Sequence, residues 1–476
     1  MRNFSRPLIN FVAVFGGNML GKLFGLISAI ILARYLGPED YGKYAFVISF
    51  AFIFMVIADY GLNDLFIRDI ARDKSLASKY LALGIIVKPL FSMVAIILLI
   101  LAVYIMGYSK DIILYTAIFS VHLIFITLVN TVSSIFKAHE RMEYSSFITI
   151  TIGMIGLIFI ASIVYLNGTL LQILMFKVVS FFIGFVLGLV IILKKIAKPD
   201  FSIDYSYVKN HLIKAMPFLT IGIIHALYFN VDIIMLSKMQ GDVYVGWYTP
   251  AANDLFFGIL IIPTAISTVI YPMFSRHFRE SIEKLRESCN FSIKILVLLG
   301  VPIGFGSFVL APQIIYFIFG SQYENSIIVL QIISIAIIFV FVRQSLGFCL
   351  AAVGKEKVLM WINAGSLGLN IVLNYILIPI YAHVGAVLTT VFCIILSVML
   401  NYFYLNKEIH NIIILRGMLK PIISASVMSI FVYSINEYNL LLVILLGAII
   451  YGAIIFLLKT FNSSEMMQLK KLFRRT

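Results

Sequence analysis

Residues 9–33 read INFVAVFGGNMLGKLFGLISAIILA, an apolar run in which Lys22 is the only charged residue. A single helical crossing of the hydrocarbon core of a bilayer takes about 20 residues, so this run is long enough. A lysine near the centre of such a helix costs roughly 2.5–3.5 kcal/mol on insertion scales. The stretch therefore predicts a membrane-spanning helix whose lysine meets something anionic inside the membrane.

Similar apolar runs recur along the whole chain. Its 476 residues are 62% hydrophobic and 12% charged, with a mean hydropathy of +1.04. A soluble domain is about 25% charged, which excludes that class. We expect an all-α polytopic membrane protein with about fourteen transmembrane helices, with approximate limits 9–33, 41–61, 80–106, 112–136, 145–166, 170–194, 212–237, 245–271, 290–318, 326–352, 358–380, 384–405, 414–435 and 439–460.

The charges of the loops predict the orientation of the chain. The net charge is +14, and most of the 36 Lys and Arg residues fall at the two termini and in the loops that follow even-numbered runs. Cytoplasmic loops of membrane proteins collect Lys and Arg. We therefore expect a multi-pass protein of the plasma membrane with both termini in the cytoplasm. The excess of Lys and Arg over Asp and Glu is explained by this orientation, so it gives no reason to expect a nucleic-acid partner.

The chain repeats weakly after six runs. Residues 36–44 read LGPEDYGKY and residues 240–248 read QGDVYVGWY, so each segment places a glycine turn on the exofacial side before the next run. Six crossings are an even number, so both halves keep one orientation, as in transporters built from parallel repeats. We expect an N-terminal six-helix lobe at 1–195 and a cytoplasmic linker at 196–210. A C-terminal six-helix lobe follows at 211–406, and two additional helices with a basic tail occupy 407–476.

Several short motifs resemble one transporter family, and the resemblance covers essentially the whole chain. They are ARYLGPEDYG at 33–42, ADYGL at 58–62, IRDIARD at 67–73, VGWYTPAA at 245–252 and YPMFSR at 271–276. In this order they resemble the polysaccharide (O-antigen type) flippases, which carry lipid-linked oligosaccharides and belong to the multidrug/oligosaccharidyl-lipid/polysaccharide exporter superfamily. The resemblance implies two pseudo-symmetric six-helix lobes around a central cavity, and alternating access. It transfers no fixed catalytic residue.

Four cations interrupt the apolar runs: Lys22, Lys177, Lys294 and Arg343. Lys22, one turn after Asn18, is a candidate cavity group, although Gly17, Gly21 and Gly25 also offer a ridge for helix packing. Arg343 is a candidate phosphate clamp because its donors are planar and bidentate, with snorkelling to the interface as the alternative. Lys177 begins a stripe with Ser180, Gly184 and Gly188 that either lines the cavity or packs on a neighbour. Lys294 lies close enough to the cytoplasmic headgroups to reach them.

Two carboxylates also lie within runs. Asp254 follows Asn253 near the middle of the eighth run, and Asp232 shares a stripe with His225 in the seventh. Both carboxylates are candidates for binding a coupling ion, H⁺ or Na⁺. Pairing with the cations is the alternative, because a buried cation needs a partner. We expect Asn18 and Asn253 to be polar groups of the cavity.

The balance of charges favours an anionic substrate. Four intramembrane cations face two carboxylates, whereas cationic drugs would require the reverse. We expect a flippase that carries a polyprenyl-(di)phosphate-linked oligosaccharide from the cytoplasmic to the exofacial leaflet, in contact with membrane lipids and glycan biosynthesis enzymes. The alternative is a cation-coupled multidrug antiporter of the same fold. The short exofacial loops argue against an enzyme, and no cofactor or metal site is expected.

Overall fold

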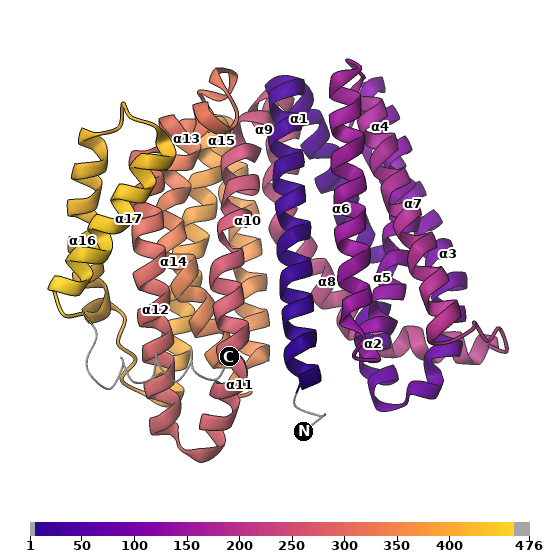
Figure 1. Ribbon diagram of the computed structural model, residues 1–476. Coiled ribbons are helices and arrows are strands. Elements are labelled where there is room, and N and C mark those ends of the chain that lie inside the picture. Colours follow the sequence, from indigo (N-terminus) through magenta and orange to yellow (C-terminus); the bar gives the residue numbers. More distant parts are fainter. Residues whose placement is uncertain (1–4, 461–476) are drawn as a thin grey trace. The chain divides into compact units, whose positions relative to one another are not determined.

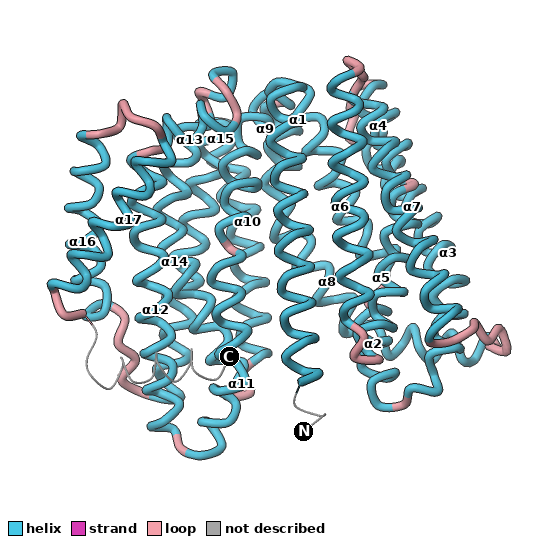
Figure 2. Tube along the Cα trace, viewed as in Figure 1, coloured by secondary structure: helices cyan, strands magenta, loops and turns pink. Residues whose placement is uncertain are grey.

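The computed structural model describes the backbone of residues 5–460, and the side chains of this range except residues 5–15, 18, 415 and 416. Every element in the described range is a helix, joined by short loops (Figure 2). The chain forms two compact units, residues 1–246 and 247–476. The division into lobes at 195 and 211 remains a prediction.

The first unit consists of eight helices and the start of a ninth (Figure 1). Their bounds are α1 Ser5–Asp59, α2 Leu62–Arg72, α3 Ala77–Ile105, α4 Lys110–Ser120, α5 His122–Ala138, α6 Met142–Tyr165, α7 Leu170–Lys195, α8 Tyr205–Gln240 and α9 Asp242–Thr249. A short 3-10 helix, Lys74–Leu76, precedes α3.

The second unit continues from α9 into a π-helix, η2. Its elements are η2 Pro250–Leu255, α10 Phe256–Ile259, α11 Ile261–Glu280, α12 Ile282–Val309, α13 Ala311–Ile318, the 3-10 helix η3 Ser321–Tyr323, α14 Ser326–Ala352, α15 Glu356–Ile409, α16 Leu415–Ser434 and α17 Leu440–Leu457.

Twelve helical segments within residues 5–460 are long and apolar enough to cross a membrane. Two of them are far longer than one crossing needs: Met19–Asp59 has 41 residues and Glu356–Ile409 has 54. Each contains one residue with non-helical backbone angles, Gly37 in α1 and Ala382 in α15, which divides it into two helices. Each long segment therefore supplies two crossings, which confirms the expected fourteen.

Three predicted runs are broken in their interior, which their apolar pattern did not predict: 112–136, 245–271 and 290–318, the last at Leu310 between α12 and α13. The run 112–136 divides between α4 and α5, where the hydroxyl of Ser120 donates to the carbonyl of Ala117 at 2.6 Å. Such a bond competes with the regular backbone pattern of a helix. The run 245–271 contains η2, which begins at Pro250, a residue without a backbone N–H. Short π-helical turns are frequent at functional sites.

Close glycine contacts pack the first half of α1 against α6. A Cβ atom at Gly17 would lie 2.3 Å from Ser146 Cβ, and one at Gly21 would lie 2.7 Å from a methyl carbon of Thr149. Small residues of this kind allow helix backbones to approach closely in membranes. The predicted packing ridge is therefore confirmed at these two glycines, whereas Gly25 meets nothing within 4 Å.

The amphipathic helix α2 closes one end of the first unit. Its buried face is apolar (Leu62, Leu65, Phe66 and Ile70), and Asp69 lies beside the cation of Arg68 at 2.8 Å and the hydroxyl of Tyr80 at 2.8 Å. Burial alone would raise the pKa of Asp69, but these two hydrogen bonds outweigh it and hold the pKa below its usual value. The carboxylate is therefore the stable form at neutral pH.

The turn between α1 and α2 fits tightly against α8. Gly61 adopts a left-handed conformation with φ 70°, and a Cβ atom there would lie 2.6 Å from the backbone nitrogen of Leu219. Gly61→Ala is therefore expected to destabilise the protein by about 1–3 kcal/mol, as measured by thermal unfolding in detergent. Gly452→Ala is the matched control, because Gly452 is helical and meets nothing within 4 Å. Equal melting temperatures of the two variants would contradict this prediction.

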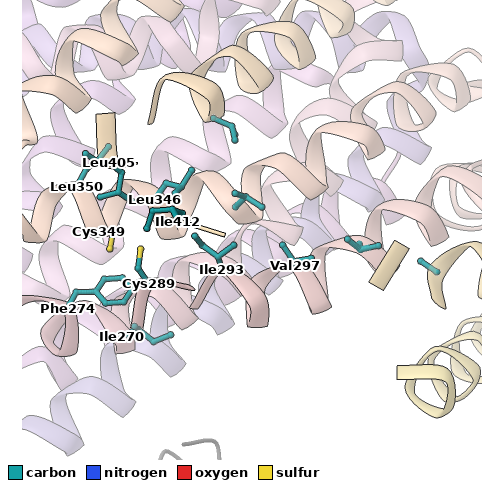
Figure 3. Packing of buried hydrophobic residues seen from close by; sticks show 14 of the residues in the cluster. Ile270, Phe274, Cys289, Ile293, Val297, Leu346, Cys349, Leu350, Leu405 and Ile412 are labelled. Atoms are coloured by element: carbon teal, nitrogen blue, oxygen red, sulfur yellow. The ribbon is translucent and has the colours of Figure 1, made fainter. Parts of the chain in front are cut away.

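The core of the second unit lies between α11, α12 and α14 (Figure 3). Phe274, Cys289 and Cys349 are each fully buried there, and α16 packs against α12. The hydroxyl of Tyr451 on α17 donates to the carbonyl of Leu298 at 2.9 Å, which fastens the last helix to the same core. These contacts make α16 and α17 part of the second unit.

Candidate functional site

Lys22 lies exposed on the first half of α1. The glycines that pack on α6 occupy a different face of this helix, and apolar neighbours of Lys22, such as Leu23, are also exposed. Within the part of the chain that the structure describes, Lys22 makes no hydrogen bond or ion pair. An ammonium group on an apolar helix face is thus free to meet an external anion. The side chain of Asn18, the predicted neighbour, lies outside the described residues.

Lys177 on α7 is half-buried and interacts with a phenol rather than a carboxylate. Its ammonium group donates to the hydroxyl of Tyr44 at 2.9 Å and lies 5.1 Å from the centre of that ring. The remainder of the predicted stripe packs on neighbouring helices, since Gly184 meets Ile152 and Gly188 meets Val132. Tyr44 compensates Lys177 only in part, because a neutral hydroxyl does not neutralise its charge.

Three of the predicted charged groups are half-buried: Arg343 on α14, Lys294 on α12 and Asp254 in η2. The fourth, Asp232 on α8, is buried. Each of the four already interacts with another group of the chain. His225 on α8 is exposed and packs on Phe229, with ring centres 4.6 Å apart. The four charged groups are therefore less open to a ligand than Lys22.

Asn253 and Asp254 both lie in the π-helix η2 and are half-buried. The charge of Asp254 reaches Tyr323, a fully buried tyrosine in η3. Burial, and to a smaller extent this negative charge, raise the pKa of Tyr323 far above its ordinary value, so its hydroxyl keeps its proton. The predicted pair of Asn253 and Asp254 on this π-helix is the second candidate site of the chain.

The structure also shows a fifth cation within the candidate spans, Lys88 on α3, which the sequence pattern did not single out. Its side chain is completely buried, and its ammonium group lies 2.8 Å from Asp59 Oδ1 and 2.5 Å from Asn63 Oδ1. Asn63 in turn donates to Asp59 at 2.5 Å. This cluster of Asp59, Asn63 and Lys88 joins α1, α2 and α3, and its members satisfy one another. The available signal was an Asp and an Asn four residues apart at the end of the second run, Asp59 and Asn63.

The predicted site residues fall in both units. The first unit contains Lys22, Lys177, His225 and Asp232. The second unit contains Asn253, Asp254 and Arg343. Within the described side chains of the first unit, Lys22 and Lys177 are not paired with Asp232. Pairing between the predicted cations and carboxylates stays a prediction.

Comparison with known proteins identifies the family. A family model described as polysaccharide biosynthesis protein matches residues 8–278, more than half of the chain. The chain belongs to this family. A second model, MatE, matches residues 217–376.

Curated relatives of the chain have names that agree with this family. The chain is 24% identical over 410 residues to the capsular polysaccharide biosynthesis protein CapF of Staphylococcus aureus, and the match covers 84% of this chain and 99% of the relative. It is also 24% identical over 407 residues to a putative O-antigen transporter of Shigella flexneri, covering 81% and 94%. A probable low-salt glycan biosynthesis flippase, Agl15 of Haloferax volcanii, is 26% identical over 38% of each chain.

Solved structures show the same fold. The lipid II flippase MurJ in an inward closed conformation superposes with a TM-score of 0.76 at 16% identity, covering 94% of this chain and 98% of that one. An inward-facing multidrug resistance MATE transporter gives a TM-score of 0.69 at 15% identity, covering 82% and 94%. The expected fold, an all-α polytopic membrane protein, is therefore confirmed.

Proposed function

We propose that this chain is a flippase that moves a polyprenyl-(di)phosphate-linked oligosaccharide, a precursor of a surface polysaccharide, from the cytoplasmic to the exofacial leaflet by alternating access. Membership of the polysaccharide biosynthesis family supports this, as do relatives named as a capsular polysaccharide protein and an O-antigen transporter. The likeness to MurJ supports the fold that such transport requires.

The observation that carries the proposal is the state of two lysines in the first unit. Lys22 is exposed and has no partner among the described residues, and Lys177 has only the hydroxyl and ring of Tyr44. An intramembrane cation without a counter-charge is costly, and such groups generally mark a substrate pathway. In this proposal the phosphate groups of the lipid carrier provide the missing counter-charge during transport, and Arg343 adds a bidentate contact.

The remaining parts of the proposal follow from the loop charges and the repeat. Both termini lie in the cytoplasm of a plasma-membrane protein, and the two lobes, 1–195 and 211–406, enclose the path of the substrate. The transport step makes and breaks no covalent bond, so the protein acts as a transporter rather than an enzyme. The coupling ion, H⁺ or Na⁺, binds at Asp254 or Asp232.

A cation-coupled multidrug antiporter is the second candidate function. The match of a MatE model to residues 217–376 favours it, as do the buried Asp232 and the placement of Asp254 on a π-helix. The surplus of intramembrane cations opposes it, because cations repel cationic drugs.

Complementation distinguishes the two functions. In cells that lack their own polysaccharide flippase, the wild-type protein is expected to restore surface glycan, measured by antibody or lectin binding, without raising resistance to ethidium. The double variant Asp232→Asn, Asp254→Asn tests the ion site, and we expect it to reduce glycan export by about tenfold or more, because a neutral amide binds a cation far less well than a carboxylate. Resistance to ethidium without restored glycan would establish the antiporter instead.

A further inference from the structure

The helix α7 carries two lysines that each pair with a tyrosine in the same way. The ammonium group of Lys177 donates to the hydroxyl of Tyr44 on α1 at 2.9 Å and lies 5.1 Å from the centre of that ring. The ammonium group of Lys195 donates to the hydroxyl of Tyr144 on α6 at 2.9 Å and lies 4.9 Å from the centre of that ring. The two lysines are separated by about 27 Å along the helix, so their surroundings differ.

The surroundings of the two pairs differ in water and in charge. Lys195 lies in the last turn of α7 and is exposed, so water supplies the partners that its tyrosine does not. Lys177 is half-buried within the apolar span, and Tyr44 is 9% exposed. The charge of Lys177 reaches His122 on α5, whose ring packs against two phenylalanines with ring centres 4.8 and 4.2 Å away. The pair at Lys177 therefore has no counter-charge among the described residues.

Lys177 and Tyr44 together offer more donors than the bond between them uses. An ammonium group has three N–H donors and a phenol has one O–H donor. Their bond uses one N–H of Lys177, and neither residue has another hydrogen-bond partner among the described residues. Two N–H donors and one O–H donor therefore remain beside a positive charge. This set complements an ionised phosphate group, whose oxygens are strong acceptors.

The pair lies near the exofacial end of the span in the predicted orientation. Tyr44 follows the turn that divides α1 by seven residues, and Lys177 follows the start of α7 by seven, so each is about 10 Å from that end. The hydroxyl of Tyr35 donates to the carbonyl of Gly168 at 2.7 Å, which holds the two starting points side by side. Lys22 precedes the same turn by about 22 Å, so one phosphate group cannot contact both lysines at once.

We propose that Tyr44 and Lys177 form a second phosphate subsite near the exofacial end of the first unit, separate from Lys22. The hydroxyl of Tyr44 and the ammonium group of Lys177 donate to the same phosphate group of the lipid carrier. This proposal rests on the proposed function, because that function supplies a polyprenyl phosphate as the anion. Tyr44 is thus a residue that contacts the substrate, and its role goes beyond support of Lys177.

Binding of undecaprenyl phosphate to the full-length protein in detergent, measured by native mass spectrometry, tests the subsite. The Lys22→Gln background removes the other subsite. In this background Tyr44→Phe is expected to weaken the affinity about three- to tenfold, because it removes one hydrogen bond and keeps the ring. Lys177→Gln should weaken it more than tenfold, and Lys177→Arg should retain most of it. Tyr144→Phe is the matched control and leaves the affinity unchanged, since it removes the same hydroxyl from the Lys195 pair.

A second lipid separates contact with phosphate from a structural effect. Undecaprenol has the same tail without the phosphate group, and its binding is expected to stay unchanged in Tyr44→Phe and Lys177→Gln. Equal losses for both lipids would show a distorted structure and would overturn the subsite. Unchanged affinity for undecaprenyl phosphate in Tyr44→Phe would also overturn it, as would an equal loss in Tyr144→Phe.

The remaining outcomes keep the subsite and the proposed function apart. If Tyr44→Phe fails to fold, Lys177→Gln decides the matter, because unchanged affinity in that variant overturns the subsite. Surface glycan in cells that depend on this protein is expected to fall in the same order as the affinity. A wild-type protein that binds undecaprenyl phosphate through these two residues but exports no glycan would refute the proposed function and leave the subsite standing.

Discussion

Lys22→Gln is expected to reduce surface glycan about ten- to hundredfold in cells that depend on this protein. A hydrogen bond to a charged group is worth about 1.5–3 kcal/mol, and this range corresponds to that loss of affinity for the phosphate groups of the lipid carrier. Glutamine retains the polarity and approximate length of lysine but removes its charge. Because Lys22 is exposed and makes no contact with a described polar group, its loss leaves the folded structure intact.

Two matched variants sharpen this test. Lys22→Arg keeps the cation and is expected to retain most of the export, whereas Lys209→Gln removes an exposed lysine from the start of α8 and should change nothing. Export is measured as surface glycan per molecule of protein in the membrane. Equal export by Lys22→Gln and Lys209→Gln would show that Lys22 does not contact the substrate.

Asp59→Asn is expected to be the most destabilising single substitution in the first unit, by about 3–5 kcal/mol. It leaves the ammonium group of Lys88 buried without a counter-charge, and this is the cost of removing one member of a buried ion pair. Lys88→Met should cost less, because the side chain of Asp59 is 17% exposed and can regain water, whereas that of Lys88 is 0% exposed. The double variant Asp59→Asn, Lys88→Met removes both charges and should be more stable than Asp59→Asn alone.

Thermal unfolding in detergent measures this order. For a domain of this size a change of 3–5 kcal/mol corresponds to a shift of roughly 6–20 °C in the midpoint. Asp111→Asn, on the exposed first turn of α4, is the control and should leave the midpoint unchanged. If the double variant melts below both single variants, the charges of Asp59 and Lys88 do not balance one another.

Hydropathy and length predicted the fold, because each membrane crossing leaves a long apolar run in the sequence. The breaks inside those runs escaped prediction, since a single hydrogen bond from Ser120 or the missing N–H of Pro250 does not alter the average hydropathy. The turns at Gly37 and Ala382, by contrast, fall in the gaps between predicted runs, 33–41 and 380–384.

The candidate site was predictable only in part. An isolated lysine such as Lys22 is visible in an apolar run, and the structure places it on an exposed face. Lys88 lies in an equally apolar run, but its role depends on Asp59, which is 29 residues away, and no local pattern reports that distance. The partner of Lys177 is likewise remote, since Tyr44 lies 133 residues away. The sequence shows where charged residues lie along a helix, but it does not show which other helix carries the residue that pairs with each of them.

The order of the Asp59–Lys88 pair along the chain has a consequence for biosynthesis. Asp59 ends α1 and Asn63 lies in the first turn of α2, so both emerge from the ribosome before Lys88 on α3. A lysine entering the bilayer alone would oppose insertion of its helix by roughly 2.5–3.5 kcal/mol. Here the carboxylate that receives it at 2.8 Å is already in the membrane when α3 leaves the translocon. The first three helices are thus arranged so that Lys88 enters lipid only after its counter-charge, Asp59, is available.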